Sequence, residues 1–364
     1  MKVVVGMSGG VDSAVSAYLL KKQGYEVVGL FMKNWDSNIN NDIEGITDDV
    51  CPQELDFRDA KNVCDELRIP LYRVDFIKEY WDDVFSYFLD ELKKGRTPNP
   101  DIMCNKYIKF DLFKSEAKKL GADYIATGHY ARLIDGKLLR GVDSNKDQTY
   151  FLSQVSRKQL ENVLFPIGDL TKEEVRKIAK DNNIPVFDKK DSTGICFIGE
   201  RHYQQFVANY LKGKSGDIVN VETNEVIGKH KGLMNYTIGQ RRNVGISGYD
   251  KRHYVCGKDS KKNILYVAFG DDSEYLLSDM AIIEDVNYLS DKRPTQATAK
   301  FRYRSQDNDV TIEYLDDTHI KVKYNGVKAV TPGQACVVYD GDECIMGGII
   351  KKVYKNNEEL WYLK

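Results

Sequence analysis

The chain has 364 residues, of which 42% are hydrophobic and 30% are charged, and its formal net charge is -2. This length predicts two or three domains. No apolar run approaches the ~20 residues of a membrane span. We expect no targeting peptide before the first predicted strand. A cytoplasmic protein is therefore expected, and the seven cysteines, which form no CxxC pair, disfavour a protein-only metal site.

The first 200 residues alternate between strand and helix patterns. Apolar runs predict strands at 2–7, 26–32, 70–76 and 123–130. Helical periodicity predicts helices at 12–24, 56–68 and 79–95. This alternation is typical of right-handed βαβ units in a doubly wound parallel sheet. The polar stretch 34–53 is long for a crossover and predicts a loop over the carboxyl edge of that sheet.

The pattern changes after residue 205, where short alternating runs separated by turns replace the helices. Strands at such intervals are typical of small barrels or sandwiches. We expect three domains: an α/β domain over 1–205, a small central β-rich domain over 206–275 and a C-terminal β-barrel over 276–364.

The stretch "GMSGGVDS" (6–13) joins the first predicted strand to the first predicted helix. Its glycines allow backbone N–H groups to face an anion, and the helix N-terminus adds partial positive charge. It is neither GxGxxG nor a Walker A loop. Asp12 would repel a phosphate unless a divalent cation lay between them. The alternative is an ordinary strand–turn–helix junction in which Ser8 or Ser13 caps the helix.

Two cysteines lie in unusual settings. Cys104, in "NPDIMCNKYIKF" (99–110), follows Asp101 by three residues. Cys196, in "KKDSTGICFIGERHY" (189–203), has basic residues nearby, and a cationic setting favours the thiolate. The alternative for each is a buried, inert thiol. Asp101 is either a general acid/base or a cap of the turn before a helix.

The stretch "SGGVDS" resembles the PP-loop of the ATP pyrophosphatase superfamily (adenine nucleotide alpha-hydrolase-like), whose members split ATP into AMP and pyrophosphate. The succession of motifs is similar to that of the tRNA-specific 2-thiouridylase family over nearly the whole chain. The motifs are "GMSGGVDS", "GLFMKNWD", "GRTPNPDIMCNKYIKF", "ADYIATGHYAR", "LLRGVDSNKDQTYFL", "KKDSTGICFIGER", "GLMNYTIGQR" and "TPGQACVVY".

The resemblance implies a reaction. ATP with Mg²⁺ adenylates the C2 oxygen of the wobble uridine in the tRNA anticodon, and sulfur then replaces that oxygen while AMP leaves. Cys196 carries the sulfur as a persulfide, supplied by a cysteine desulfurase or a relay protein. Cys104 is the second thiol, and a Cys104–Cys196 disulfide is the by-product. The expected acceptors are the glutamate, glutamine and lysine tRNAs.

The resemblance also implies site residues. The catalytic residues are Cys104, Cys196 and Asp101. The expected ATP-binding residues are Gly6, Met7, Ser8, Gly9, Gly10, Val11, Asp12, Ser13, Met32 and Gly128, with Mg²⁺ at Asp12. The expected tRNA contacts are Asn99, Pro100, Asp101, His129, Lys146, Asp147, Gln148, Arg302, Tyr303 and Gln334.

Simpler interpretations stay open for several of these residues. Residues 146–148 could form a solvated turn, and 301–304 could be the outer face of an edge strand. Arg241 and Arg242 could bind backbone phosphate or be solvated. Alternative functions are another PP-loop tRNA-modifying enzyme with a different target base, such as a 4-thiouridine or lysidine synthetase, and a non-catalytic tRNA-binding protein with a relic ATPase fold.

Overall fold

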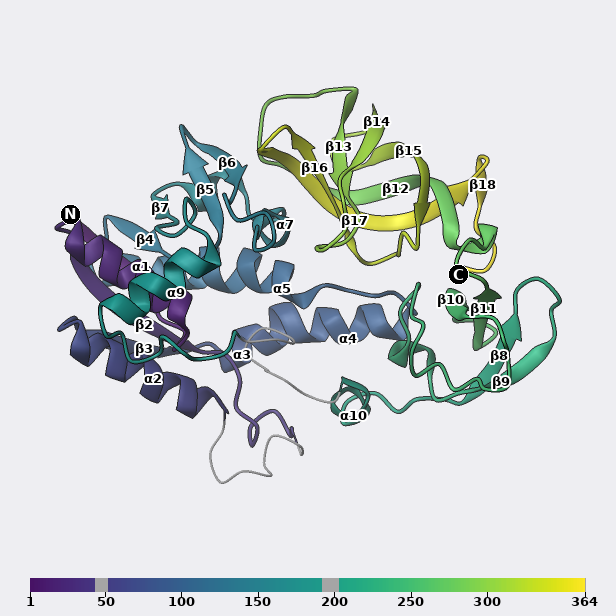
Figure 1. Cartoon of the computed structure of the whole chain (residues 1–364), viewed down its shortest axis with the longest axis horizontal. Helices are drawn as coiled ribbons and strands as arrows, with labels where there is room; N and C mark the ends of the chain where they lie inside the picture. The colour runs from purple at the N-terminus through teal and green to yellow at the C-terminus, as the bar shows by residue number, and fades with distance from the viewer. Residues whose placement is uncertain (43–51, 192–202, 364) are drawn as a thin grey trace.

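The structure is a computed structural model that describes residues 1–42, 52–191 and 203–363. An α/β domain at the N-terminus is followed by a small β-rich domain and a C-terminal β-barrel, which can be distinguished in Figure 1. The predicted fold class is confirmed. Within the described residues, no helix combines the length and apolar character needed to cross a membrane.

The N-terminal domain is built on a parallel sheet with the order β3-β2-β1-β4-β7. Its strands are β1 Lys2–Gly6, β2 Glu26–Lys33, β3 Leu71–Asp75, β4 Tyr124–Ala126 and β7 Val163–Leu164. The chain runs outward from β1 to β3 and then returns to β4 on the other side of β1. In such sheets, ligands bind beyond the carboxyl ends of the strands where the order reverses. The end of β1 is therefore the expected binding edge.

Helices cover both faces of this sheet. Val3 and Val5 of β1 pack toward one set of helices, while Val4 packs toward the other, as the alternation of a strand requires. The first face is covered by α1 Val11–Lys22, α2 Pro52–Glu66 and α9 Lys172–Asp181. The second is covered by α3 Ile77–Tyr80, η2 Trp81–Phe85, α4 Ser86–Lys93, α5 Pro100–Met103, η3 Cys104–Leu112 and α6 Phe113–Lys119.

The helix expected over 79–95 is present as a continuous helical run over 77–93 that contains a π-helical segment. The π-helical segment η2 joins α3 to α4, and a second such segment, η3, joins α5 to α6. The periodicity of apolar residues does not reveal a π-helical turn, since one extra residue per turn shifts the pattern only locally. Shorter helices in this domain are α7 Thr149–Leu152 and α8 Arg157–Leu160.

The central domain carries a sheet with the order β10-β11-β8-β9. Its elements are β8 Gly216–Asn220, β9 Val226–His230, η4 Leu233–Asn235, β10 His253–Asp259 and β11 Ile264–Phe269. Helix α10 Tyr203–Ala208 precedes them, and its Phe206 packs on Phe85 of the N-terminal domain. Ile218, Val255, Leu265 and Val267 form part of its core.

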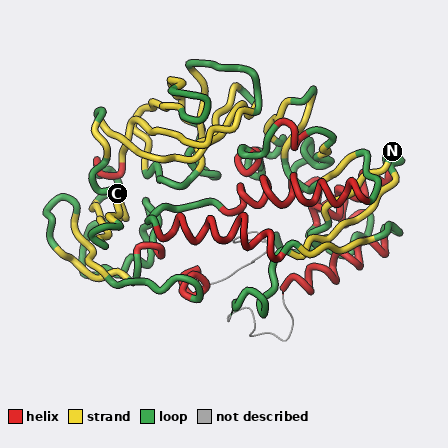
Figure 2. Tube along the Cα trace, turned by 180° about the vertical axis from the view of Figure 1, so that it is seen from behind, coloured by secondary structure: helices red, strands yellow, loops and turns green. Residues whose placement is uncertain are grey.

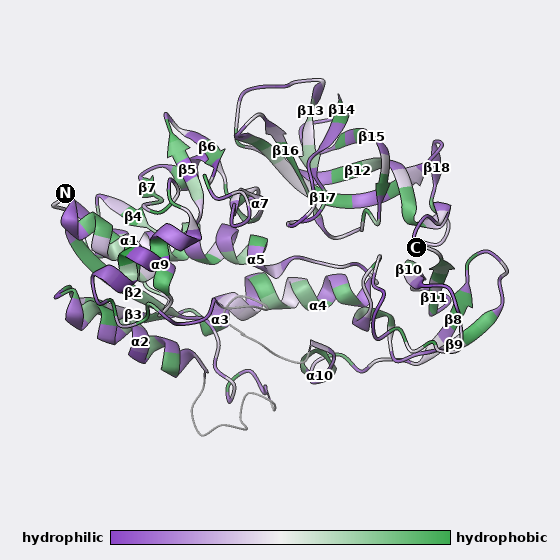
Figure 3. Cartoon of the chain, in the orientation of Figure 1, coloured by the Kyte–Doolittle hydropathy of each residue, from purple (hydrophilic) through white to green (hydrophobic). Residues whose placement is uncertain are grey.

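The C-terminal strands close into a barrel, because β12 pairs with both β15 and β17. After η5 Glu274–Leu276, its strands are β12 Leu277–Tyr288, β13 Gln296–Lys300, β14 Asn308–Tyr314, β15 Ile320–Lys328, β16 Ala335–Asp340 and β17 Glu343–Lys355, with β18 Glu358–Glu359 beside β17. Buried and exposed residues alternate along β14, and Figure 3 shows the same alternation of hydropathy on the barrel strands.

The N-terminal domain adds a hairpin to this barrel sheet, which the sequence pattern did not predict. The hairpin consists of β5 Ala131–Ile134 and β6 Lys137–Arg140, and Leu139 pairs with Glu343 of β17. A second junction lies beyond α4, which Figures 1 and 2 show extending toward the barrel. There Arg96 pairs with both Glu91 (3.2 Å) and Glu284 of β12 (3.1 Å). Both junctions fix the barrel to the N-terminal domain, and further contacts run from the segment around α7, such as the hydrogen bond from the Tyr150 hydroxyl to the carbonyl oxygen of Ala335 (3.1 Å).

Candidate active site

The loop between β1 and α1 is held by its own serines. The Ser13 hydroxyl donates to the carbonyl oxygen of Gly10 (3.0 Å) and accepts the backbone N–H of Ser8 (3.2 Å). Gly9 has φ +73°, and a Cβ atom there would lie 2.3 Å from the carbonyl oxygen of Asp56 in α2. Only glycine fits this position. Helix α1 begins at Val11 without a side-chain cap, so the N–H groups of its first turn remain available to an anion.

Other residues expected to bind ATP gather at the same edge. Met32 is the next-to-last residue of β2, and its Cε atom lies 3.6 Å from the position of a Cβ at Gly6. A Cβ at Gly128 would lie 2.8 Å from the backbone of Asp12 and Ser13, so glycine permits the close approach of the β4 end to α1. Met7 and Val11 have buried side chains in the core. Their contribution to a ligand site is therefore limited to the backbone.

The carboxylate of Asp12 is engaged in a network. It accepts hydrogen bonds from the hydroxyl of Tyr130 (2.8 Å) and from Nζ of Lys172 (2.8 and 2.9 Å). Lys172 also pairs with Asp191 (2.7 Å). Burial raises the pKa of Asp191, but hydrogen bonds from Lys146 and Lys172 outweigh it and lower that pKa to about 2. This carboxylate is therefore ionised at neutral pH.

A second lysine contacts the loop from the side of α2. Nζ of Lys189 donates to the carbonyl oxygen of Gly9 (3.1 Å) and to the carboxylates of Asp56 (2.8 Å) and Asp59 (2.6 Å). Burial lowers the pKa of Lys189, but the two carboxylates outweigh it and raise that pKa. Lys189 is thus a cation held by two anions.

The residues present fit ATP accompanied by Mg²⁺. No three His, Cys, Asp or Glu side chains within 1–42, 52–191 and 203–363 form a metal site of their own. Mg²⁺ commonly uses one or two carboxylates together with phosphate oxygens and water. Asp12, at the helix start beside the glycine loop, is the residue placed to supply such a carboxylate.

Cys104 begins a π-helical segment on the other face of the sheet. The side chain of Asn99 caps α5 by accepting the N–H of Asp101 (3.1 Å), so Asn99 and not Asp101 caps this turn. Cys104 is fully buried, and Asp101 is half-buried one helical turn before it. Residues three apart on a helix share a face. π-helical turns are rare and frequently occur at functional sites.

The other cysteines of the described residues are buried as Cys104 is. Cys196 and Cys51 lie outside the described residues. Burial raises the pKa of Cys64 and of Cys336 to about 12. A thiol with so high a pKa is a poor nucleophile at neutral pH.

His129 lies between the glycine loop and the helical segment that begins at Cys104. Its Nδ1 is 2.7 Å from the hydroxyl of Thr127, and its ring contacts Phe110 of η3 and Phe165. Burial, followed by the charge of Lys109, lowers the pKa of His129 well below its usual value. The imidazole is therefore neutral at physiological pH.

The segment 146–148 is tied into the domain. Lys146 pairs with Asp191 (2.6 Å). Asp147 is buried and accepts hydrogen bonds from Gly141 and Thr149. The side chain of Gln148 accepts the N–H of Tyr130 (2.9 Å). A direct tRNA contact of Asp147 stays a prediction, and the structure gives this carboxylate a role inside its own turn.

The expected tRNA contacts of the barrel also hold domains together. Arg302 donates to the carbonyl oxygens of Ile238 (2.6 Å), in the central domain, and of Ala329 (2.7 Å). Tyr303 packs on Phe151 of the N-terminal domain, with ring centroids 4.4 Å apart. Gln334 donates to the carbonyl oxygen of Thr97 (2.6 Å). These three residues lie where the domains meet.

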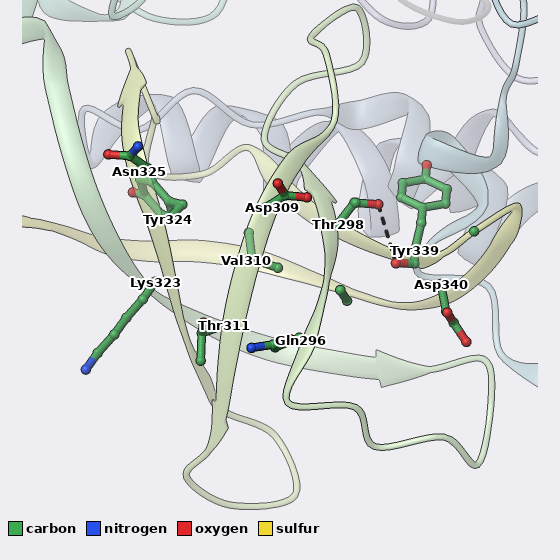
Figure 4. A pocket seen from close by; sticks show the side chains of 12 residues that line it. Gln296, Thr298, Asp309, Val310, Thr311, Lys323, Tyr324, Asn325, Tyr339 and Asp340 are labelled. Atoms are coloured by element: carbon green, nitrogen blue, oxygen red, sulfur yellow. Dashed lines mark hydrogen bonds between the residues drawn. The ribbon is translucent and has the colours of Figure 1, made fainter.

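A separate hollow of about 730 Å³ lies on the barrel strands (Figure 4). Polar side chains such as Thr311, Lys323 and Asn325 line it. None of the residues expected from the sequence to form a site lines this hollow.

Several side chains at the loop were not identified from the sequence. Lys172 follows Asp12 by 160 residues, and Tyr130 follows it by 118. No local spacing links such distant positions. The sequence offered one indication of these partners. The motifs that contain Tyr130 and Asp191 belong to the same series of family motifs as the glycine loop.

Comparison with known proteins gives matches along the whole chain. Three family models match: "tRNA methyl transferase HUP domain" over residues 1–200, "tRNA methyl transferase PRC-barrel domain" over 204–269 and "Aminomethyltransferase beta-barrel domain" over 278–350. A tRNA-specific 2-thiouridylase of Mycoplasmopsis synoviae is 53% identical over 99% of this chain and 98% of its own. That of Mycoplasma capricolum is 55% identical over 97% and 99%, and that of Bacillus cytotoxicus 52% identical over 100% and 98%.

Proposed function

The chain belongs to the tRNA-specific 2-thiouridylase family, and we propose that it uses ATP to replace the C2 oxygen of the wobble uridine of tRNA with sulfur. The resemblance found in the sequence is thereby confirmed at the level of the family. One structural observation carries the proposal. The helical segment that begins at Cys104 packs against the edge of the glycine loop, since Phe110 contacts His129 and the Phe113 ring lies 3.5 Å from the position of a Cβ at Gly6.

Adenylation makes the C2 oxygen a leaving group. The N–H groups of the Ser8–Ser13 loop bind phosphate oxygens, and Mg²⁺ bound with ATP supplies charge to the phosphates near Asp12. Attack of the uridine oxygen on the α-phosphate then releases pyrophosphate. Asp101, half-buried three residues before Cys104, moves a proton at the base in this proposal.

Sulfur transfer uses the two thiols. The terminal sulfur of a persulfide on Cys196 attacks C2, and AMP leaves with the former oxygen. The Cys104 thiolate attacks Sγ of Cys196, which breaks the sulfur–sulfur bond and leaves 2-thiouridine and a Cys104–Cys196 disulfide. A dithiol reductant supplies two electrons to restore the thiols. The sulfur comes from a cysteine desulfurase or a relay protein.

The proposed reaction also requires that the chain contact its tRNA substrate. Asn99, Pro100, Asp101 and His129 surround the target base, and residues 146–148, Arg302, Tyr303 and Gln334 contact the rest of the anticodon arm. The acceptors are the glutamate, glutamine and lysine tRNAs in the cytoplasm. The domain limits 1–205, 206–275 and 276–364 remain a proposal.

Three other outcomes deserve a test. The family models carry the words methyl transferase, whereas the relatives are named 2-thiouridylases. The glycine loop and Cys104 favour thiolation over methylation, because methyl transfer needs neither an ATP-cleaving loop nor a persulfide. The remaining alternatives are another PP-loop enzyme acting on a different base and a tRNA-binding protein without activity.

The test is the stoichiometry of the reaction. The protein is incubated with unmodified tRNA, α-labelled ATP and a persulfide donor, and AMP and thionucleoside are both quantified. We expect one AMP for each thionucleoside, and no AMP without tRNA. Methylated tRNA formed with S-adenosylmethionine, or no AMP and no thionucleoside with an active donor, would contradict the proposal.

A further inference from the structure

Helix α4 ends close to the residues that carry the proposed sulfur transfer. In a Schellman motif, the N–H of Gly95 donates to the carbonyl oxygen of Leu92 and that of Arg96 donates to Glu91, both at 3.0 Å. Gly95 has φ +77°, a conformation that glycine adopts without strain. Arg96 is thus fixed at the end of α4. Only two residues separate it from residues 99–104, which we call the catalytic turn.

The guanidinium of Arg96 bridges the N-terminal domain and the barrel. Its Nη1 atom lies 3.2 Å from a carboxylate oxygen of Glu91 and 3.1 Å from one of Glu284 in β12. Each carboxylate also pairs with a lysine, Glu91 with Lys94 (2.8 Å) and Glu284 with Lys351 (2.9 Å). Burial raises the pKa of Glu284, but Lys351 and Arg96 outweigh it and lower that pKa. The side chain of Glu91 is only 5% exposed, and a pair shielded in this way is stronger than one in bulk water.

The barrel holds the next residue from the same strand. The turn 331–334 forms hydrogen bonds with both the N–H and the carbonyl oxygen of Thr97, and it is itself bonded to Ile350 of β17. Glu284 faces Ile349 of β17 in the register between β12 and β17. The groups that hold Arg96 and Thr97 are thus fastened to adjacent residues of one sheet, which makes them a common support for the chain that enters the catalytic turn.

We propose that Arg96 is a positioning residue for thiolation, and that its pairing with Glu284 fixes how the catalytic turn meets the target base. Pro98 and Pro100 lie on either side of Asn99, and their rings restrict the backbone there, so a displacement of Arg96 is passed on to the turn. A displacement of about 1 Å can slow a reaction by about 100-fold. This inference rests on the proposed function, because it takes thiolation as the reaction that the turn serves.

The test removes the barrel partner and leaves Arg96 paired with Glu91. Glu284→Ala does this, and Arg96→Lys keeps the charge but loses the planar fork that spans two carboxylates. Asp307→Ala is the matched control, because Asp307 pairs with Arg140 (2.8 Å) at the other junction of the barrel with the N-terminal domain. Single-turnover thiolation should slow by about 10-fold or more in Glu284→Ala and Arg96→Lys, with the Kd for tRNA within about threefold of the wild type. Asp307→Ala should match the wild type in both.

A second readout follows the turn itself, without tRNA. The reduced protein is treated with iodoacetamide, and the labelling of Cys104 and Cys64 is followed by mass spectrometry. Both thiols are buried, so their labelling reports local opening of the structure. Glu284→Ala should raise the labelling rate of Cys104 by about threefold or more and leave that of Cys64 unchanged.

Three results would overturn the inference. One is a Glu284→Ala protein that has the wild-type rates of thiolation and of Cys104 labelling. Another is equal slowing in Asp307→Ala, which would assign the effect to docking of the whole barrel. The third is faster labelling of Cys104 and Cys64 alike, as a general loss of stability requires. If Glu284→Ala does not fold, Arg96→Lys is judged by the same results. A wild type that thiolates no tRNA would refute the proposed function, and the labelling of Cys104 would still decide whether this pair holds the turn.

Discussion

The side-chain amide of Gln334 donates a hydrogen bond of 2.6 Å to the backbone carbonyl of Thr97. The N–H of Thr97 in turn donates to the carbonyl oxygen of Pro332 (3.0 Å). Gly333 has φ +91°, and a Cβ there would lie 2.9 Å from Cβ of Arg96. The turn 331–334 of the barrel therefore packs directly on the chain just before Asn99, which caps the turn that carries Asp101.

This contact predicts that Gln334→Ala slows the chemical step. Removing the amide should lower kcat for thiolation by about 3- to 10-fold, since one hydrogen bond contributes about 0.5–1.5 kcal/mol. Because Gln334 is also a proposed tRNA contact, affinity for tRNA should fall as well, whereas Gln306→Ala, an exposed glutamine of the same domain, should change neither quantity. An unchanged kcat with weakened tRNA binding would contradict a role of Gln334 in positioning the catalytic turn.

Cys104→Ser should lose thiolation while it still binds tRNA. A hydroxyl cannot cleave a persulfide, so single-turnover formation of 2-thiouridine should fall by about 10³-fold or more. Cys64→Ala is the control, because Cys64 is equally buried in the same domain and its pKa is raised to about 12. Equal losses in the two variants would point to a folding defect and would contradict a catalytic role for Cys104.

Gly9→Ala tests the fit of the loop against α2. Gly9 and Gly24 both have positive φ, +73° and +87°, but a Cβ at Gly24 meets nothing within 4 Å. Alanine at either position costs about 1–2 kcal/mol of backbone strain, and Gly9→Ala must in addition displace the Asp56 backbone. We expect ATP binding by titration to be lost in Gly9→Ala and kept in Gly24→Ala. Normal ATP affinity of Gly9→Ala would contradict the proposed loop conformation.

His129 should make the fold sensitive to mild acid. Burial lowers its pKa in the folded state, so below the usual value of about 6.5 the unfolded chain binds a proton that the folded chain does not. Stability is therefore present above this pH and is lost as pH falls below it, by at most about 1.4 kcal/mol per pH unit. Urea unfolding of His129→Phe between pH 7 and pH 5 should show a smaller decline than the wild type. Parallel curves would contradict this account.

The sequence predicted the parts of the fold that depend on local pattern. The apolar run at 2–7 became β1 Lys2–Gly6, and the alternating runs after residue 205 became the central sheet and the barrel. The strand expected at 123–130 is shorter, β4 Tyr124–Ala126, and the chain beyond it brings Gly128 against Asp12 and Ser13 instead of continuing the sheet.

Features that depend on distant pairings were not predicted. The hairpin β5–β6 joins the barrel sheet through Leu139 and Glu343, which lie more than 200 residues apart in sequence. Arg302 was expected as a tRNA contact or as part of the outer face of an edge strand, and Gln334 as a tRNA contact, yet both form hydrogen bonds between domains. A motif indicates that such a residue matters but does not say what it touches, since its partner lies in another domain.

The most direct measurement is the position of the thiolated base. Two unmodified transcripts of one glutamate tRNA, with uridine or cytidine at the wobble position, are incubated with the protein, ATP, Mg²⁺ and a persulfide donor. The products are separated on an organomercury gel, and the modified base is located by nuclease mapping. The account predicts an ATP-dependent shift that maps to the wobble uridine and is missing from the cytidine transcript. An equal shift of both transcripts, or a thiolated base elsewhere in the tRNA, would contradict it.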